Sequence, residues 1–160
     1  MKKIIAIVAG LAILTTSLMA EKTLSVKAAD YGVISEDGTS SPLIGLDFTT
    51  TSRFKNHIMY GFGAGAYFNN GSFVDGGVGE FDGKLGVTFA NIDMYALAGV
   101  SYQSLSNDLQ SSGFMYGAGI GYVAFDHLSM KVEYKTASLE KDDDISYTLD
   151  GLSVGIGYQF

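Results

Sequence analysis

The 160-residue sequence contains no cysteine and a single proline, Pro42. The chain therefore has no disulfide, no thiolate metal site and no cysteine nucleophile. A high glycine content of 21 residues beside one proline suits long strands rather than a disordered chain. Outside one short stretch near the N-terminus, no run approaches the about 18 consecutive apolar residues of a helical membrane span.

The first twenty residues have the three parts of a secretory signal peptide. Lys2 and Lys3 form a basic region, residues 4–14 are apolar apart from small residues, and a more polar tail ends at Ala20. We predict a signal peptide over residues 1–20, cleaved after Ala20, and one domain over residues 21–160. The alternative is an uncleaved inner-membrane anchor, for which the apolar stretch is short.

The expected mature chain is strongly acidic. It holds eight basic against seventeen acidic residues, a net charge of −9. Such a balance argues against nucleic acid as a partner. An exported chain without disulfides needs another source of stability, and a closed ladder of strands in lipid supplies one.

The last residues of the chain alternate in polarity without a break. The apolar members are Leu152, Val154, Ile156, Tyr158 and Phe160, and the small or polar members are Ser153, Gly155, Gly157 and Gln159. Because the side chains of a strand point alternately to its two faces, one face is wholly apolar. An apolar face that ends in an aromatic residue indicates a strand of an outer-membrane β-barrel, with lipid outside and a polar lumen inside.

Other segments show the same alternation between polar or glycine-rich connectors. The predicted strands cover about residues 23–33, 43–51, 58–68, 78–89, 92–103, 114–123 and 128–137, and the segment ending at Phe160. The predicted fold is all-β, an eight-stranded antiparallel transmembrane β-barrel with up-and-down topology. Ten strands are the alternative, although they leave little room for connectors. In the fifth segment we place Met94 outward; a register with Tyr95 and Leu97 outward is also open.

Connector lengths indicate which end of the barrel is which, since bacterial barrels have short periplasmic turns and longer extracellular loops. The short connectors are residues 53–57, 90–91 and 124–127, and the longer ones are residues 35–42, 69–77, 104–113 and 138–146. Their alternation predicts a protein of the bacterial outer membrane with both termini in the periplasm.

Charged residues opposite the apolar faces distinguish a membrane barrel from a water-soluble one. These residues are Asp47, Glu80, Asp82, Lys84, Lys131, Glu133 and Lys135. Facing lipid, each charge at mid-depth would cost about 2–4 kcal/mol. Facing water, the apolar face would be a continuous, aggregation-prone girdle of Phe and Tyr. A lipocalin-like soluble barrel with an apolar interior therefore fits less well than a membrane barrel.

The interior of an eight-stranded barrel is just wide enough to be filled by side chains. We predict that the charged residues form a network of salt bridges that plugs the lumen, since a buried charge requires a partner. Structural filling is the main interpretation, and a gate or a narrow ion pathway is the functional alternative.

Catalytic and metal sites have weak support in the sequence. Asp126-His127-Leu128-Ser129 places a histidine two residues from a serine, a pattern similar to that of outer-membrane lipid A deacylases, but it lies at a predicted periplasmic turn. The run Asp142–Asp144 lacks the spaced ligands and turn glycine of a calcium loop. The two histidines, His57 and His127, lie in separate turns with no third ligand evident. We predict no catalytic residue, no bound metal and no cofactor.

Four segments carry a family resemblance. They are residues 94–102 (MYALAGVSY), 114–122 (FMYGAGIGY), 126–134 (DHLSMKVEY) and 155–160 (GIGYQF). In this order they resemble the fifth, sixth, seventh and closing strands of the OmpX/Ail-type barrels and, more loosely, of the OmpA transmembrane domain. The resemblance covers about the last seventy residues well and the first half by pattern.

The resemblance implies an eight-stranded barrel in which Glu133 occupies an interior acidic position that pairs with basic lumenal residues. It also implies a C-terminal assembly signal, here Val154, Ile156, Tyr158 and Phe160, that the barrel-assembly machinery reads. The adhesive members of the family have long protruding strands, whereas the loops predicted here are shorter and acidic. An adhesive role therefore does not carry over.

We expect a monomeric integral outer-membrane protein with a structural or surface-interaction role. Its expected contacts are outer-membrane lipids, lipopolysaccharide, periplasmic chaperones and the assembly machinery during biogenesis, and an extracellular ligand that the sequence does not identify. The alternatives are a small-conductance channel and, with less support, an enzyme that modifies lipid A.

Overall fold

The computed structural model describes residues 20–30, 42–54, 57–69, 72–105, 110–125, 127–141 and 146–160. Residues 1–19 of the predicted signal peptide lie outside these ranges, as do Asp126 and the acidic run Asp142–Asp144. Within the described ranges, no helix is both long enough and apolar enough to cross a membrane.

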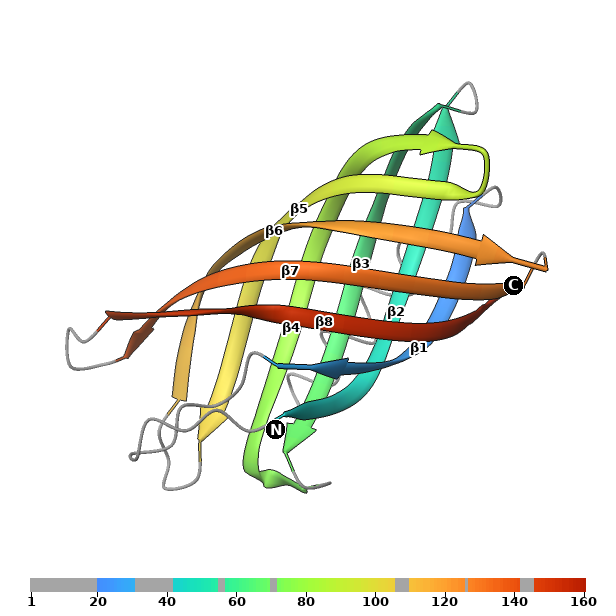
Figure 1. The fold of residues 1–160 in the computed structure, drawn as a ribbon. Coiled ribbons are helices and arrows are strands. Elements are labelled where there is room, and N and C mark those ends of the chain that lie inside the picture. Colours follow the sequence, from blue (N-terminus) through green and yellow to red (C-terminus); the bar gives the residue numbers. More distant parts are fainter. Residues whose placement is uncertain are drawn as a thin grey trace.

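Eight antiparallel strands form a closed barrel in which each strand pairs with its neighbours in the sequence (Figure 1). Their bounds are β1 Glu21–Ala29, β2 Leu43–Phe54, β3 Ile58–Asn69, β4 Ser72–Phe89, β5 Ile92–Leu105, β6 Gln110–Ala124, β7 Leu128–Lys141 and β8 Ser146–Gln159. The predicted up-and-down arrangement of eight strands is confirmed, and the ten-stranded alternative is wrong.

The barrel closes between its first and last strands. A ladder that includes the pair Val26 and Ile156 joins β1 to β8. Beyond it, the Lys22 amide donates to the Phe160 carbonyl oxygen at 3.2 Å, and the Phe160 amide donates to the Lys22 carbonyl oxygen at 2.8 Å. Closure is essential in lipid, because an open edge would leave backbone groups without hydrogen-bond partners.

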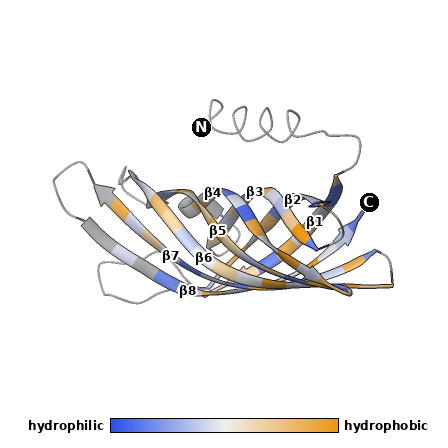
Figure 2. Ribbon diagram, turned by 90° about the horizontal axis from the view of Figure 1, so that it is seen from above, coloured by the Kyte–Doolittle hydropathy of each residue, from blue (hydrophilic) through white to orange (hydrophobic). Residues whose placement is uncertain are grey.

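Side chains alternate between the outer wall and the lumen, and Figure 2 shows the result as bands of opposite hydropathy along the strands. On β7, Val132 is 44% exposed, whereas its neighbours Lys131 and Glu133 are 8% and 0% exposed. On β5, Met94 faces outward while Tyr95 is buried in the lumen. The register that places Met94 outward is therefore confirmed, and the shifted register is wrong.

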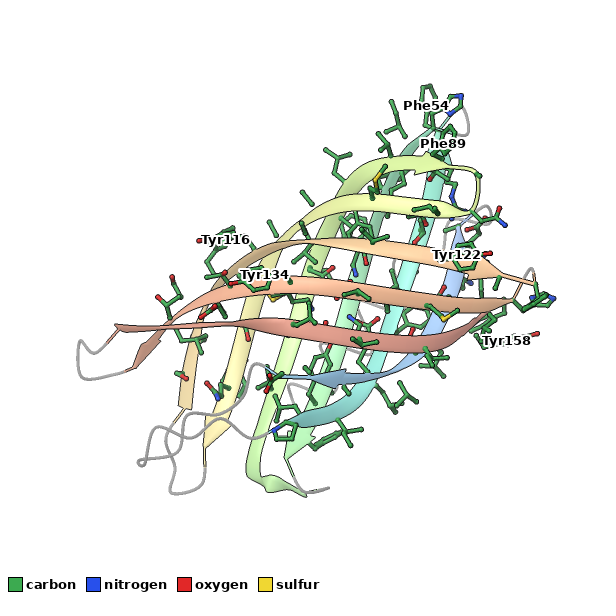
Figure 3. The ribbon with its side chains drawn as sticks, in the orientation of Figure 1. Phe54, Phe89, Tyr116, Tyr122, Tyr134 and Tyr158 are labelled. Atoms are coloured by element: carbon green, nitrogen blue, oxygen red, sulfur yellow. The ribbon has the colours of Figure 1, made fainter. Side chains whose placement is uncertain are left out.

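Aromatic rings lie at two levels of the apolar outer wall (Figure 3). Phe54, Phe89, Tyr122 and Tyr158 lie at the end of the barrel that carries the β4–β5 turn, and Tyr116 and Tyr134 lie farther toward the opposite end. Aromatic residues at both edges of an apolar band are typical of outer-membrane barrels.

Several strand bounds differ from those that the sequence predicts. The β2–β3, β4–β5 and β6–β7 connections lie at one end, termed the short-turn end, and the other connections lie at the loop end. Strands extend into three predicted long loops, since β4 begins at Ser72, β5 ends at Leu105 and β7 ends at Lys141. Serine and glycine favour loops locally, but cross-strand pairs such as Gly76 with Leu105 hold this part of β4 extended. The longest connection is residues 30–42, at the loop end.

Candidate functional site

The lumen is the candidate site, because charged side chains from four strands meet there away from the outer wall. They are Lys27 on β1, Asp47 on β2, Glu80, Asp82 and Lys84 on β4, and Lys131, Glu133 and Lys135 on β7, each at most 8% exposed. We term this set the lumenal network. Its four lysines and four carboxylates have formal charges that cancel, which is the balance that buried charges require.

Glu133 lies at the centre of the lumenal network. Lys27 Nζ donates to Glu133 Oε2 at 2.5 Å, and Lys84 Nζ donates to Glu133 Oε1 at 2.5 Å. Lys135 Nζ lies 3.3 Å from Oε2, and the Tyr95 hydroxyl donates to Oε1 at 2.8 Å. One carboxylate thus joins β1, β4, β5 and β7, and its loss would leave three lysines without their shared counter-ion.

The other carboxylates connect the lysines into a continuous group. Asp47 accepts a hydrogen bond from Lys131 and another from Lys27 Nζ at 3.2 Å. Glu80 Oε2 accepts a hydrogen bond from Lys135 Nζ at 2.6 Å. Because Lys27 and Lys135 also contact Glu133, the ion pairs form one network rather than isolated pairs.

All the charged residues predicted to face the lumen lie there, and the structure adds Lys27 to them. The predicted set contains four carboxylates but three lysines, and that excess of buried negative charge is the signal that another cation is needed. Lys27 alternates on β1 with the outward Val26 and Ala28, so the period of two already places it inside.

A second polar group closes the short-turn end, and the sequence-based prediction misses it. Arg53 Nη2 donates to Asp93 Oδ2 at 2.9 Å, and Arg53 also pairs with Glu21. Thr88 Oγ1 accepts a hydrogen bond from Arg53 Nε at 3.2 Å and donates one to Asp93 Oδ1 at 2.6 Å. The prediction assigns Arg53 to a connector, whereas β2 extends through Phe54. The Arg53 side chain is 20% exposed, so solvent screens this group more than the lumenal network.

Apolar and aromatic side chains pack in the lumen around the lumenal network. One cluster consists of Ala29, Leu43, Tyr67 and Val78, and a second consists of Met59, Tyr95, Leu97, Met115, Ala137 and Leu139. Leu43, Tyr67 and Met115 have no exposed surface. An ion beside the aliphatic and methionine side chains of these clusters would lose its hydration without gaining a polar partner from them.

Glycines on the inner faces leave room for the network. A Cβ at Gly119 would lie 2.8 Å from Glu133 Cγ and 2.8 Å from the Tyr95 ring. A Cβ at Gly155 would lie 2.7 Å from Lys27 Cγ. Because the ion pairs hold these side chains in place, a methyl group at either glycine would displace part of the network.

A small cavity of about 50 Å³ lies between the lumenal network and the short-turn end. Its walls include Thr49, Arg53, Tyr95 and Lys131. This polar space has room for water. Beyond this cavity, the lumenal network and the apolar clusters fill the lumen.

The residues of the deacylase-like motif do not form a nucleophile and base. The His127 ring stacks on the outward Tyr158 with centroids 5.2 Å apart, and its Nδ1 lies 3.0 Å from the Gln159 carbonyl oxygen. Ser129 faces the lumen, and its hydroxyl has no hydrogen-bond partner among the described residues. A serine nucleophile needs an adjacent base, which this geometry does not supply. Within the same described residues, no group of three or more His, Cys, Asp or Glu could hold a metal ion.

The predicted assembly-signal residues form one row on the outer face of β8. Val154, Ile156, Tyr158 and Phe160 are 48%, 58%, 58% and 61% exposed. The row lies beside β1, at the junction that closes the barrel.

No protein-family model matches the sequence, and no curated protein matches it. Solved structures do match the fold. Ail, the attachment invasion locus protein of Yersinia pestis, in a complex with the heparin analogue sucrose octasulfate, has a TM-score of 0.60 at 19% identity, over 89% of this chain and 99% of that chain. The N-terminal β-barrel domain of OprF from Pseudomonas aeruginosa has a TM-score of 0.58 at 15% identity, over 89% and 98%.

Neisserial surface protein A has a TM-score of 0.55 at 12% identity, over 88% of this chain and 94% of that chain. At such identities the likeness establishes the fold. The resemblance to OmpX/Ail-type and OmpA-domain barrels is therefore confirmed at the level of the fold. The chain is an eight-stranded β-barrel of the type that these small outer-membrane proteins form.

Proposed function

We propose that this chain is an integral outer-membrane protein with a closed lumen, a structural or surface-interaction role and no catalytic activity. The observation that carries the proposal is the contrast between an apolar outer wall and a buried, charge-balanced lumenal network. The wall suits hydrocarbon. The network and the apolar clusters together leave no continuous hydrated path through the described part of the lumen.

Both termini lie in the periplasm in this proposal. It is supported by the longest connection, residues 30–42, which lies at the end of the barrel opposite Phe160. An epitope inserted between residues 36 and 37 should bind antibody on intact cells. Binding that requires a permeabilised outer membrane would reverse the orientation.

Long strands support a role at the cell surface. Strands β4 to β8 have 14–18 residues, more than the about 9–11 residues that cross a membrane. Ser112, Ser138 and Thr148 are exposed near the loop end, where the wall is polar. With these longer strands, the barrel is more similar to the adhesive members of the family, which have long protruding strands. Ail was solved with a sulfated heparin analogue, but the net charge of −9 expected for residues 21–160 favours a neutral or cationic ligand here.

Contacts within the membrane complete the proposal. The wall contacts phospholipid and lipopolysaccharide, and the row Val154, Ile156, Tyr158 and Phe160 is presented to the assembly machinery after delivery by periplasmic chaperones. A monomer suffices, because the lumenal network balances its charges within one barrel.

Planar-bilayer recording tests the closed lumen. The purified, inserted barrel should give no discrete current steps, because the lumenal network and apolar clusters exclude hydrated ions. Regular steps from the wild-type barrel would favour the small-conductance channel instead.

Mass spectrometry of lipid A and phospholipid from cells with and without the protein tests catalysis. A modified lipid that depends on the protein would contradict a non-enzymatic role.

A further inference from the structure

We propose that the outer wall near the short-turn end binds the acyl chain of one phospholipid from the periplasmic leaflet. This inference rests on the membrane insertion and orientation proposed above. A hollow of about 500 Å³ lies on the wall where β1, β2, β7 and β8 meet. Its apolar lining includes Leu24, Val26, Leu46, Phe125, Leu128 and Ile156.

The lining of the hollow suits a flexible hydrocarbon chain. Leu24, Val26, Leu46 and Ile156 are each about half exposed and branched aliphatic, whereas larger rings such as Tyr158 stand beside them. Gly157, which has no side chain, also lines the hollow. Because unfilled space beside a wall forfeits dispersion contacts, a lipid chain seated here contacts more protein than one lying on the flat wall.

Phe125 is an independent indication of a lipid contact. This residue, in the β6–β7 turn, has a φ of 52°, which bulky side chains rarely adopt, and its surface is 90% exposed. The ring lines the hollow rather than packing into the lumen. An exposed ring gains little stabilisation in water, but it makes favourable apolar contacts when an acyl chain lies beneath it.

Two polar side chains lie where the headgroup of that lipid would be. Lys22 alternates on β1 with the outward Leu24, and it pairs with Phe160 at the short-turn end. The exposed His127 lines the hollow and stacks on Tyr158 (Tyr158 is labelled in Figure 3). Along β1 from Lys22 to Val26, the outer wall thus changes from a cationic side chain to aliphatic side chains. This order matches that of a lipid phosphate followed by its acyl chain.

Photo-crosslinking tests this site directly. The barrel is placed in nanodiscs of phosphatidylethanolamine that contain a phosphatidylglycerol with a diazirine at the end of one acyl chain. After illumination, peptide mapping should show stronger labelling at Leu24, Val26 and Leu46 than at Leu85 and Val87 on the outer face of β4. Equal labelling of the two faces would mean annular lipid alone and would overturn the proposal.

Matched variants sharpen the test. Val26→Trp fills the hollow and should abolish the preferential labelling, whereas Val100→Trp on the outer face of β5 should not change it. Phe125→Gly removes the ring and relieves its backbone strain, so labelling should fall while the barrel stays folded. Lys22→Gln should weaken the preference for the anionic probe by about fivefold, the effect of one lysine near an anionic lipid surface. Unchanged labelling in Val26→Trp and Phe125→Gly would overturn the proposal.

Other occupants have distinct signatures. Lipopolysaccharide crosslinked at this hollow in native outer membranes would place the hollow in the outer leaflet and overturn the proposal. A disulfide that joins two Leu46→Cys barrels would assign this face to a second copy of the chain and would also overturn it. A wild-type barrel that inserts and closes but labels evenly refutes the lipid site alone. A chain that fails to insert refutes the proposed function itself.

Discussion

On β7, Val132 faces outward at 44% exposure, whereas Glu133, the next residue, has no exposed surface and contacts three lysines. The two positions differ in what surrounds them. In the proposed membrane setting, Val132 faces hydrocarbon, in which another apolar side chain serves nearly as well. Glu133 faces particular partners at particular distances, so its identity matters more. The cost of a substitution should therefore depend on which side of the wall it lies, and the following experiments test that difference.

The largest expected effect comes from removing the centre of the lumenal network. Glu133→Ala leaves Lys27, Lys84 and Lys135 without their shared carboxylate and should lower the free energy of unfolding by about 3–5 kcal/mol. Urea titration in lipid vesicles, read by the mobility of unheated samples on gels, measures it. The control Val132→Ala should lose distinctly less. Equal losses at the two positions would remove the contrast between wall and lumen.

A charge on the wall should have the next largest effect. Val132→Arg puts a cation near mid-depth in hydrocarbon and should cost about 2–4 kcal/mol in the same titration. Phe89→Arg, at the short-turn end, should cost about 0–1 kcal/mol because it reaches the interface. A cost independent of depth would argue against a lipid-facing wall.

A methyl group inside the barrel should have a smaller effect than a lost charge. Gly119→Ala places a Cβ 2.8 Å from both Glu133 and Tyr95, and overpacking of this kind costs about 1–3 kcal/mol. Gly83→Ala on the outer face meets its nearest atoms at 3.9 and 4.0 Å and should be nearly neutral. Equal midpoints of unfolding in these two variants would show that the lumen is loosely packed.

The smallest effect is expected at the short-turn end. Arg53→Met removes the contacts with Glu21, Thr88 and Asp93 but keeps most of the side-chain volume. Because Glu21 is 41% exposed and Arg53 is 20% exposed, the loss should be about 1 kcal/mol or less. A loss as large as that of Glu133→Ala would mean that this partly solvated group contributes as much as the buried network.

The sequence predicts which side chains face the outer wall and which face the lumen better than it predicts the contacts within the lumen. Period-two alternation predicts the strand number and which residues face outward, because solvent on each side of a sheet selects polarity at every second position. It also places the charged residues inside. It does not say which lysine meets which carboxylate, because these contacts cross the barrel between residues as distant as Lys27 and Glu133.

Local amino-acid composition predicts several strands to be shorter than they are. Residues 72–77 (SFVDGG) resemble a loop because of Ser72, Asp75 and the two glycines, and so do parts of residues 104–113 and 138–146. In the barrel they continue as strands, because each is paired with a neighbour that is already extended. Arg53 is missed for the same reason, since β2 runs three residues beyond the predicted end at Thr51.

The sequence by itself determined the class of fold, the number of strands and the two chemically different faces, because alternation is a local property that every strand repeats. Only the tertiary structure decided the pairing within the lumen, the polar group around Arg53 and the hollow beside Phe125. These features arise where closure brings β1 against β8 and faces strands across a narrow interior, and no local pattern encodes that distance.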